Sequence, residues 1–147
     1  MYYARVEAWF SAAHFLSHYR GKCEKLHGHN YKVRLWVRGE ELDEGGMLAD
    51  FSLLKKALKE TLEPLDHSNL NDIEFFKRDS AAGDSSTGDS TAGDPNAGDP
   101  SAERIARFVF EKLREKLPEL GVESSLLYAV DVYETEGSMA RYTMEVE

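Results

Sequence analysis

The chain has 147 residues, 41% of them apolar, which is enough for the core of one ordinary domain. Its 18 lysines and arginines against 27 aspartates and glutamates give a formal net charge of −9, which argues against a nucleic-acid-binding surface. No run of about 18 apolar residues is present, so we expect no membrane span, and Arg5 and Glu7 within the first apolar stretch argue against a signal peptide. The single cysteine, Cys23, fits a reducing compartment, so a cytoplasmic protein is expected.

Alternation of apolar and polar residues predicts four strands. The first covers residues 2–14 and the second residues 30–38. The third and fourth cover residues 126–134 and 139–146, joined by a hairpin turn at 135–138. In the third strand, one apolar face is predicted to hold Leu126, Tyr128, Val130 and Val132.

Two amphipathic helices are predicted between these pairs of strands. Apolar residues recur at spacings of three and four from Phe51 to Leu65, after Asp50 as a capping residue. A second helix is predicted over 102–117, with Ser101 as its N-cap and Pro118 ending it.

A repeat separates the two helices. Residues 80–99 are four tandem pentads that each end in Gly-Asp and contain no large apolar residue. Because such a segment cannot offset its ordering entropy by burial, a flexible surface insertion is expected. The regular aspartate spacing also suggests a calcium array, but the denser oxygen ligands of known calcium loops are missing.

The order of elements is strand, strand, helix, insertion, helix, strand, strand. This order predicts one α+β domain over residues 1–147, with antiparallel hairpins and both helices on one face of the sheet (ββααββ). Two hairpins leave two open sheet edges, and open edges are usually covered or paired. Oligomerisation through sheet edges is therefore expected.

Three of the five histidines have the parity of the apolar strand faces. His14 ends the first strand, and His27 and His29 begin the second. If the two strands form a hairpin, the three imidazoles meet at one end, on the face turned toward the helices. Three histidines with an open fourth position are typical of catalytic zinc, whereas the alternative is three hydrogen-bonded core histidines.

Other polar residues are candidates for chemistry. Cys23 lies four residues before His27; beside a cation, its thiol is a usable base or nucleophile, but as a fourth ligand it would make the site structural. Glu134 has the apolar parity at the end of its strand, where a carboxylate usually has a partner or ligand. Asp66 and His67, by themselves, are an ordinary loop pair.

Six motifs follow one another along the chain. They are Phe10-Ser-Ala-Ala-His14, Cys23-Glu-Lys-Leu-His27-Gly-His29-Asn-Tyr31, Gly46-Met-Leu-Ala-Asp50-Phe51, Leu65-Asp-His67-Ser-Asn-Leu-Asn71, Pro100-Ser-Ala-Glu103 and Glu134-Thr135. Their order resembles the 6-pyruvoyl-tetrahydropterin synthase family, and most of all its 6-carboxy-tetrahydropterin-forming branch in queuosine biosynthesis. The resemblance covers the whole chain except residues 80–99.

The resemblance implies the tunnelling fold, in which each subunit contributes a four-stranded antiparallel sheet and two helices. Three subunits close a barrel and two barrels stack into a homohexamer. It also implies that His14, His27 and His29 bind zinc, which holds side-chain oxygens of 7,8-dihydroneopterin triphosphate. Cys23 is implied as the base that abstracts a proton.

Further roles follow from the same resemblance. Asp66 and His67 would complete the relay of the base, from a neighbouring subunit. Glu134 would anchor the N–H edge of the pterin ring and join the proton relay. Glu103 matches the start of the family's second helix and would serve the substrate or the subunit interface.

The chain departs from the family pattern at three places. Arg104 stands where an asparagine is usual, and the 80–99 insertion has no counterpart. Glu24 places Glu-x-x-His-Gly-His over the same window as the cysteine motif. Family members that use a glutamate here cleave the same substrate to 6-hydroxymethyl-dihydropterin for folate synthesis, so Glu24 is a possible alternative base.

The expected activity is that of a zinc-dependent lyase. The leading product is 6-carboxy-5,6,7,8-tetrahydropterin, with loss of acetaldehyde and triphosphate. The alternative products are 6-pyruvoyl-tetrahydropterin and 6-hydroxymethyl-dihydropterin. A non-catalytic zinc- or pterin-binding module is a different class of function, against which Cys23, Asp66, His67 and Glu134 argue.

Overall fold

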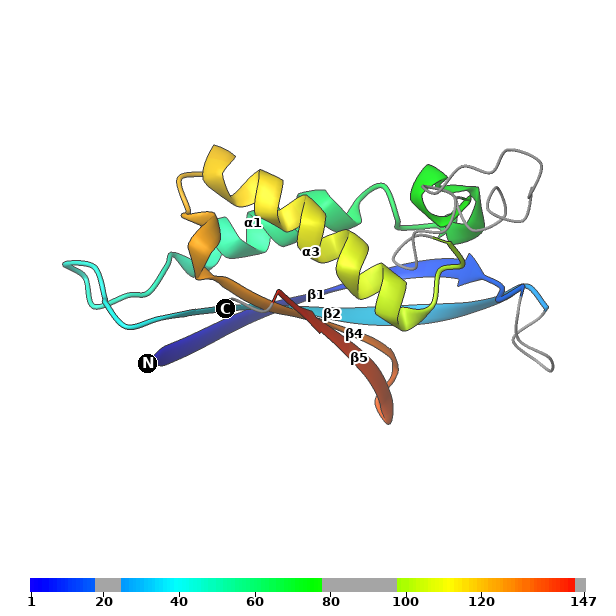
Figure 1. Ribbon diagram of the computed structural model, residues 1–147, viewed down its shortest axis with the longest axis horizontal. Helices are drawn as coiled ribbons and strands as arrows, with labels where there is room; N and C mark the ends of the chain where they lie inside the picture. The colour runs from blue at the N-terminus through cyan, green and yellow to red at the C-terminus, as the bar shows by residue number, and fades with distance from the viewer. Residues whose placement is uncertain (18–24, 78–97, 145–147) are drawn as a thin grey trace, which may run out of the picture.

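The computed structural model describes residues 1–17, 25–77 and 98–144, which form a five-stranded sheet covered on one face by two helices (Figure 1). The strand order is β3-β1-β2-β4-β5, and neighbours are antiparallel except β3, which runs parallel to β1. The predicted α+β fold with both helices on one face is confirmed. The elements are β1 (Tyr2–His14), β2 (His27–Gly39), α1 (Phe51–Leu62), β3 (Ser68–Asn69), α3 (Ala102–Glu119), β4 (Leu127–Thr135) and β5 (Ser138–Thr143), with 3-10 turns η2 (Leu70–Asp72) and η5 (Ser124–Leu126).

The long hairpin of β1 and β2 carries the histidines of the predicted cluster. Its register pairs His14 with His27 and Phe10 with Tyr31. The second strand therefore begins at His27, earlier than the predicted start at residue 30. Pairing with the end of β1 extends the strand over the His-Gly-His motif, which brings the histidines of both strands together.

The two helices begin where the capping residues predict. The side chain of Asp50 accepts a hydrogen bond from the Ser52 N–H, and Ser101 Oγ accepts one from the Arg104 N–H. The prediction that Pro118 ends the second helix is wrong, because α3 continues to Glu119. In the last turn the missing proline N–H removes one bond, while Leu120 N–H still reaches the Leu117 carbonyl at 3.0 Å. No helix of the described residues is long and apolar enough to cross a membrane.

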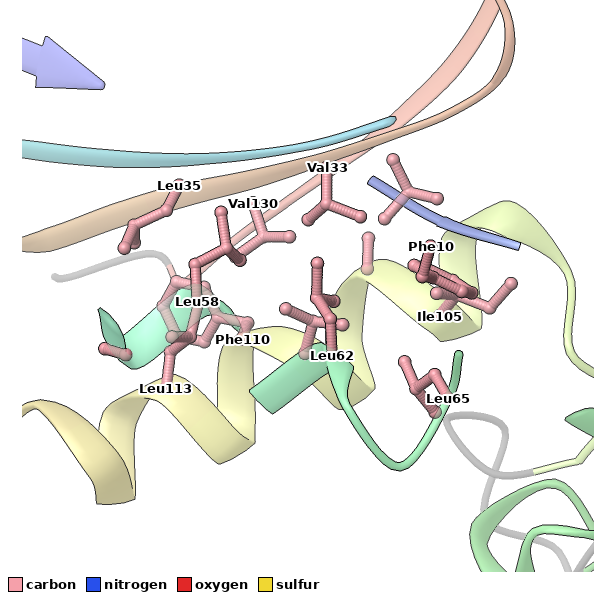
Figure 2. Close-up of a cluster of buried hydrophobic side chains, with 14 of the residues drawn as sticks. Phe10, Val33, Leu35, Leu58, Leu62, Leu65, Ile105, Phe110, Leu113 and Val130 are labelled. Atoms are coloured by element: carbon pink, nitrogen blue, oxygen red, sulfur yellow. The ribbon is translucent and has the colours of Figure 1, made fainter. Parts of the chain in front are cut away.

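The core lies between the sheet and the two helices (Figure 2). Leu58 on α1 and Leu113 on α3 are fully buried against Val33, Leu35 and Val130 of the sheet. Each such side chain contributes about 1.5–3 kcal/mol by leaving water. This packing fixes the helix-covered face of β1, β2 and β4, on which the histidines stand.

A register shift between β2 and β4 changes which residues of β4 face the core, compared with the sequence prediction. Between Trp36 and Val37 the pairing of β2 with β4 slips, and Leu127 rather than Tyr128 enters the core. Tyr128 instead contacts Tyr3 edge-on, with ring centroids 5.5 Å apart. The bulge therefore turns one aromatic ring of the predicted apolar face away from the helices.

Two other features differ from the sequence expectation. The strand β3 adds to the four predicted strands, pairing Ser68 and Asn69 with the edge of β1. At the end of the repeat, Gly98 and Asp99 are buried rather than on the surface. The expected flexibility and the calcium array of residues 80–97 lie outside the described residues.

Candidate metal centre

Three imidazoles meet at one end of the β1–β2 hairpin. One ligand atom from each of His14, His27 and His29 lies within 4.8 Å of the others, and His14 is only 1% exposed. The predicted convergence of these histidines is confirmed. Their ring centroids lie 4.5–5.0 Å apart with steeply inclined planes, so that nitrogens rather than ring faces are turned together.

Backbone carbonyls decide which nitrogens carry the protons. His14 Nδ1 lies 2.7 Å from the Pro100 carbonyl and His27 Nδ1 lies 2.7 Å from the Lys25 carbonyl. A carbonyl only accepts, so both Nδ1 atoms donate and the neutral rings present lone pairs at Nε2. These two Nε2 atoms are 2.9 Å apart, so with both Nδ1 atoms protonated their lone pairs face each other.

The third imidazole has an unpartnered nitrogen. His29 Nε2 is buried and has no hydrogen-bond partner among the described residues. Burial lowers the pKa of His14 and of His29, in both cases as the largest cause, so the neutral forms that bind a metal are favoured. Three converging imidazoles, two of them with the outer nitrogen held by a backbone carbonyl, are an arrangement suited to a metal ion.

Glu134 stands beside the three histidines. Its two carboxylate oxygens lie 4.0 Å from His14 Nε2 and 3.9 Å from His29 Nε2. The carboxylate is 27% exposed and does not belong to the group of mutually close ligand atoms formed by the histidines. It is therefore placed to accept a hydrogen bond from a molecule that reaches the metal position.

One buried group of this site was not singled out from the sequence. The Tyr31 hydroxyl is buried without a hydrogen-bond partner among the described residues, and its ring lies 5.3 Å from the ring of His29. Burial, with a smaller effect of Glu134, raises the pKa of this phenol, so it stays protonated. Tyr31 lies two residues after His29 and therefore on the same strand face, which could have marked it as part of the site. The alternating pattern identified it only as a core residue.

Asp66 and His67 lie at the outer edge of β1. Asp66 Oδ1 accepts the Ser11 N–H at 2.9 Å, and this bond is the main reason why the pKa of Asp66 is lowered. The second oxygen lies 3.0 Å from His67 Nδ1. His67 and His29 line one shallow surface pocket of about 460 Å³, together with Asn30.

The backbone of His67 is strained. Its φ of 57° lies in the left-handed region, which typically costs a non-glycine residue about 1–3 kcal/mol. The His67 N–H donates to the Ser11 carbonyl at 2.6 Å, so pairing with β1 holds this conformation. Strand pairing therefore fixes both residues of the Asp-His pair, and the imidazole remains 82% exposed.

Three predicted site residues remain, namely Glu103, Cys23 and Glu24. Glu103 is exposed in the first turn of α3, three residues after Pro100. Cys23 and Glu24 lie outside the described residues, so their predicted roles are not tested by the geometry.

Comparison with known proteins agrees with this geometry. The family model described as 6-pyruvoyl tetrahydropterin synthase matches residues 3–145. The chain is 32% identical to a 6-carboxy-5,6,7,8-tetrahydropterin synthase of Haemophilus influenzae, over 97% of this chain and 99% of that protein. It is 37% identical to the protein of the same name from Synechocystis sp., over 90% of this chain and 86% of the other.

A solved structure shows the same fold. The 6-pyruvoyl tetrahydropterin synthase of Caenorhabditis elegans superposes with a TM-score of 0.77 at 29% identity, covering 98% of this chain and 96% of the other. The chain is an enzyme of lyase type and belongs to the 6-pyruvoyl tetrahydropterin synthase family. The family expected from the six motifs is thus confirmed.

Proposed function

We propose that this enzyme is a zinc-dependent lyase that converts 7,8-dihydroneopterin triphosphate to 6-carboxy-5,6,7,8-tetrahydropterin, releasing acetaldehyde and triphosphate. The observation that carries the proposal is the cluster of His14, His27 and His29, with two outer nitrogens held by carbonyls and one Nε2 unpartnered. The names of the Haemophilus influenzae and Synechocystis sp. relatives support the choice of product.

The three histidines hold the zinc ion in this proposal. When bound, zinc supplies a Lewis acid that polarises a side-chain oxygen of the substrate, making the adjacent C–H acidic. Cys23 removes that proton as a thiolate, and Asp66 with His67 forms the relay. The hydrogen bonds that fix Asp66 on Ser11 support a pre-positioned pair.

Glu134 and Glu103 bind the substrate in the same scheme. A carboxylate accepts the N–H groups along one edge of a pterin ring, and the Glu134 carboxylate on β4 lies 4.0 Å from His14 Nε2 and 3.9 Å from His29 Nε2. Glu103 lies in the first turn of α3, three residues after Pro100, whose carbonyl contacts His14 at the end of β1. Its exposure leaves it available to the substrate or to another subunit.

The active enzyme is proposed to be a trimer or hexamer with sites at subunit interfaces. Among the described residues, β3 covers only Ala12 and Ala13 of the outer β1 edge, and β5 is the last strand on the other side. Trp9, near that β1 edge, is 60% exposed. Light scattering of the purified protein is expected to give a mass of three or six chains.

Two other products remain as alternatives. Loss of triphosphate without carbon–carbon cleavage gives 6-pyruvoyl-tetrahydropterin, the product class named for the Caenorhabditis elegans protein. Cleavage to 6-hydroxymethyl-dihydropterin would use Glu24 in place of Cys23 as the base. A carboxylate can take this role when burial raises its pKa.

The test is a turnover assay with mass-spectrometric identification of every product. The zinc-loaded protein is expected to release 6-carboxy-5,6,7,8-tetrahydropterin and acetaldehyde from 7,8-dihydroneopterin triphosphate. Glu24→Ala is expected to retain this activity. Release of 6-hydroxymethyl-dihydropterin, abolished in Glu24→Ala, would contradict the proposal. Tight pterin binding without any product would instead indicate a non-catalytic module.

A further inference from the structure

A short segment, Gly98–Ser101, is attached to the end of β1 beside the metal centre. Gly98, Asp99 and Pro100 are all buried, with Asp99 only 5% exposed. This segment is the last part of the repeat and its junction with α3. Its burial is unexpected because the local sequence is small and polar.

Asp99 makes the tightest contacts of this segment. One carboxylate oxygen, Oδ2, accepts both the Ser17 N–H and the Ser17 Oγ–H, each at 2.6 Å. The Asp99 carbonyl accepts the Ser101 N–H at 2.8 Å, which connects the residue to the N-cap of α3. Asp99 therefore joins the chain just beyond His14 to the start of a helix.

The next residue contacts the metal centre directly. The Pro100 carbonyl accepts from His14 Nδ1 at 2.7 Å. Ser17 lies only three residues after His14, so the two segments are joined at two points. The proline ring fixes φ at Pro100 and restricts Asp99 to an extended backbone, so little freedom remains between the two attachments.

We propose that Asp99 is a positioning residue for the metal ligand His14. Its carboxylate fixes the Pro100 carbonyl, and that carbonyl fixes the tautomer and ring orientation of His14. Outer hydrogen bonds of this kind orient metal-binding histidines and keep the ligating nitrogen free. The identity of the metal in this inference rests on the proposed function. The contacts of Asp99 with Ser17 and of Pro100 with His14 do not depend on which reaction is catalysed.

The experiment measures zinc affinity by competition with a chelator, and the absorption spectrum of the cobalt-substituted protein. Asp99→Ala is expected to weaken zinc binding about 10–100-fold and to change the cobalt ligand-field spectrum. Asp99→Asn keeps an acceptor oxygen for Ser17, so it is expected to restore most of the affinity and the wild-type spectrum. Ser17→Ala, which loses one of the two bonds, should have a smaller effect than Asp99→Ala.

Asp43 offers a matched control. Its Oδ1 also accepts two hydrogen bonds, here from the N–H groups of Gly45 and Met47 at 2.9 Å each, in the loop after β2. Asp43→Ala is expected to leave zinc affinity and the cobalt spectrum unchanged. An equal loss in Asp43→Ala and Asp99→Ala would overturn the proposal, because the effect would then be general.

Two further outcomes separate this inference from the proposed function. If the wild type binds zinc tightly and Asp99→Ala binds it equally well with the same cobalt spectrum, the role of Asp99 is refuted while the metal centre stands. If the wild type binds no zinc, both fail. Should Asp99→Ala not fold, Ser17→Ala decides, because unchanged zinc affinity in that variant refutes the role.

Discussion

Two polar clusters are buried in this sheet, on opposite faces. On the open face, away from the helices, Asp131 is 1% exposed and accepts hydrogen bonds from Trp36 Nε1 at 2.8 Å and from Arg141 Nε and Nη2 at 2.6 and 3.0 Å. On the helix-covered face, the histidine cluster, formed by His14, His27 and His29, contains facing lone pairs and an unpartnered nitrogen.

The difference lies in hydrogen-bond satisfaction. Asp131 has a donor for each oxygen, and this pairing raises the pKa of Arg141, so the cluster is complete within the chain. The histidine cluster is incomplete, because its ligand atoms lie together and His29 Nε2 has no hydrogen-bond partner among the described residues. A complete buried cluster stabilises the fold, whereas an incomplete one leaves polar atoms that a ligand from outside the chain can satisfy.

The largest effect is expected from removing part of the incomplete cluster. His29→Ala should lose bound zinc and turnover together, because two imidazoles do not supply the three protein ligands of a catalytic zinc site. Elemental analysis and the turnover assay check this result. Full zinc content in His29→Ala would show that the histidines do not form the metal site.

The Cys23→Ala variant tests whether Cys23 is a base or a fourth protein ligand that completes the histidine cluster. If Cys23 is the base, the variant should keep its zinc and lose about 10²–10⁴-fold in turnover, the usual contribution of a positioned base. Zinc content and turnover are measured on the same preparation. Loss of zinc would mean that the cluster is closed within the chain, as the Asp131 cluster is.

Asp131→Ala removes the centre of the complete cluster. The Trp36 N–H and the Arg141 guanidinium lose their acceptor, and we expect a loss of about 2–3 kcal/mol in the free energy of unfolding. The value is below that for a fully buried pair because Arg141 is 40% exposed and can be hydrated. Urea denaturation measures the loss, and zinc affinity should not change.

Glu7→Ala is the matched control for that variant. Glu7 is 41% exposed on the same face, with its carboxylate 3.9 Å from Arg34 Nε. Exposed ion pairs contribute about 0–1 kcal/mol, so the control should change stability little. Equal destabilisation in the two variants would contradict the importance of Asp131 burial.

The sequence predicted the features that depend on local pattern. Alternation placed His14, His27, His29 and Glu134 on the helix-covered face, and register then brought them together. The caps of both helices followed from Asp50 and Ser101. These predictions succeeded because periodicity and capping are properties of a few neighbouring residues.

The features that were missed depend on distant partners. The two-residue strand β3 exists because Ser68 and Asn69 pair with β1, which no local pattern specifies. Tyr128 leaves the apolar face because a bulge shifts the register of β4. The burial of Asp99 requires Ser17, and its own sequence neighbours resemble those of a surface repeat.

The smallest effect is expected from shortening the repeat. Replacing residues 80–97 by a short glycine–serine linker should leave zinc affinity and turnover close to those of the wild type. The Gly98 N–H donates to the Phe75 carbonyl at 3.3 Å, so the ends of the replaced segment lie together and a short linker can join them. Halving a loop changes the free energy of unfolding by only about 0.6 kcal/mol.

Deleting residues 80–99 instead also removes Asp99, and should weaken zinc binding as Asp99→Ala does. Measured side by side, equal zinc affinities in the two deletions would show that the buried end of the repeat does not contribute to the metal centre.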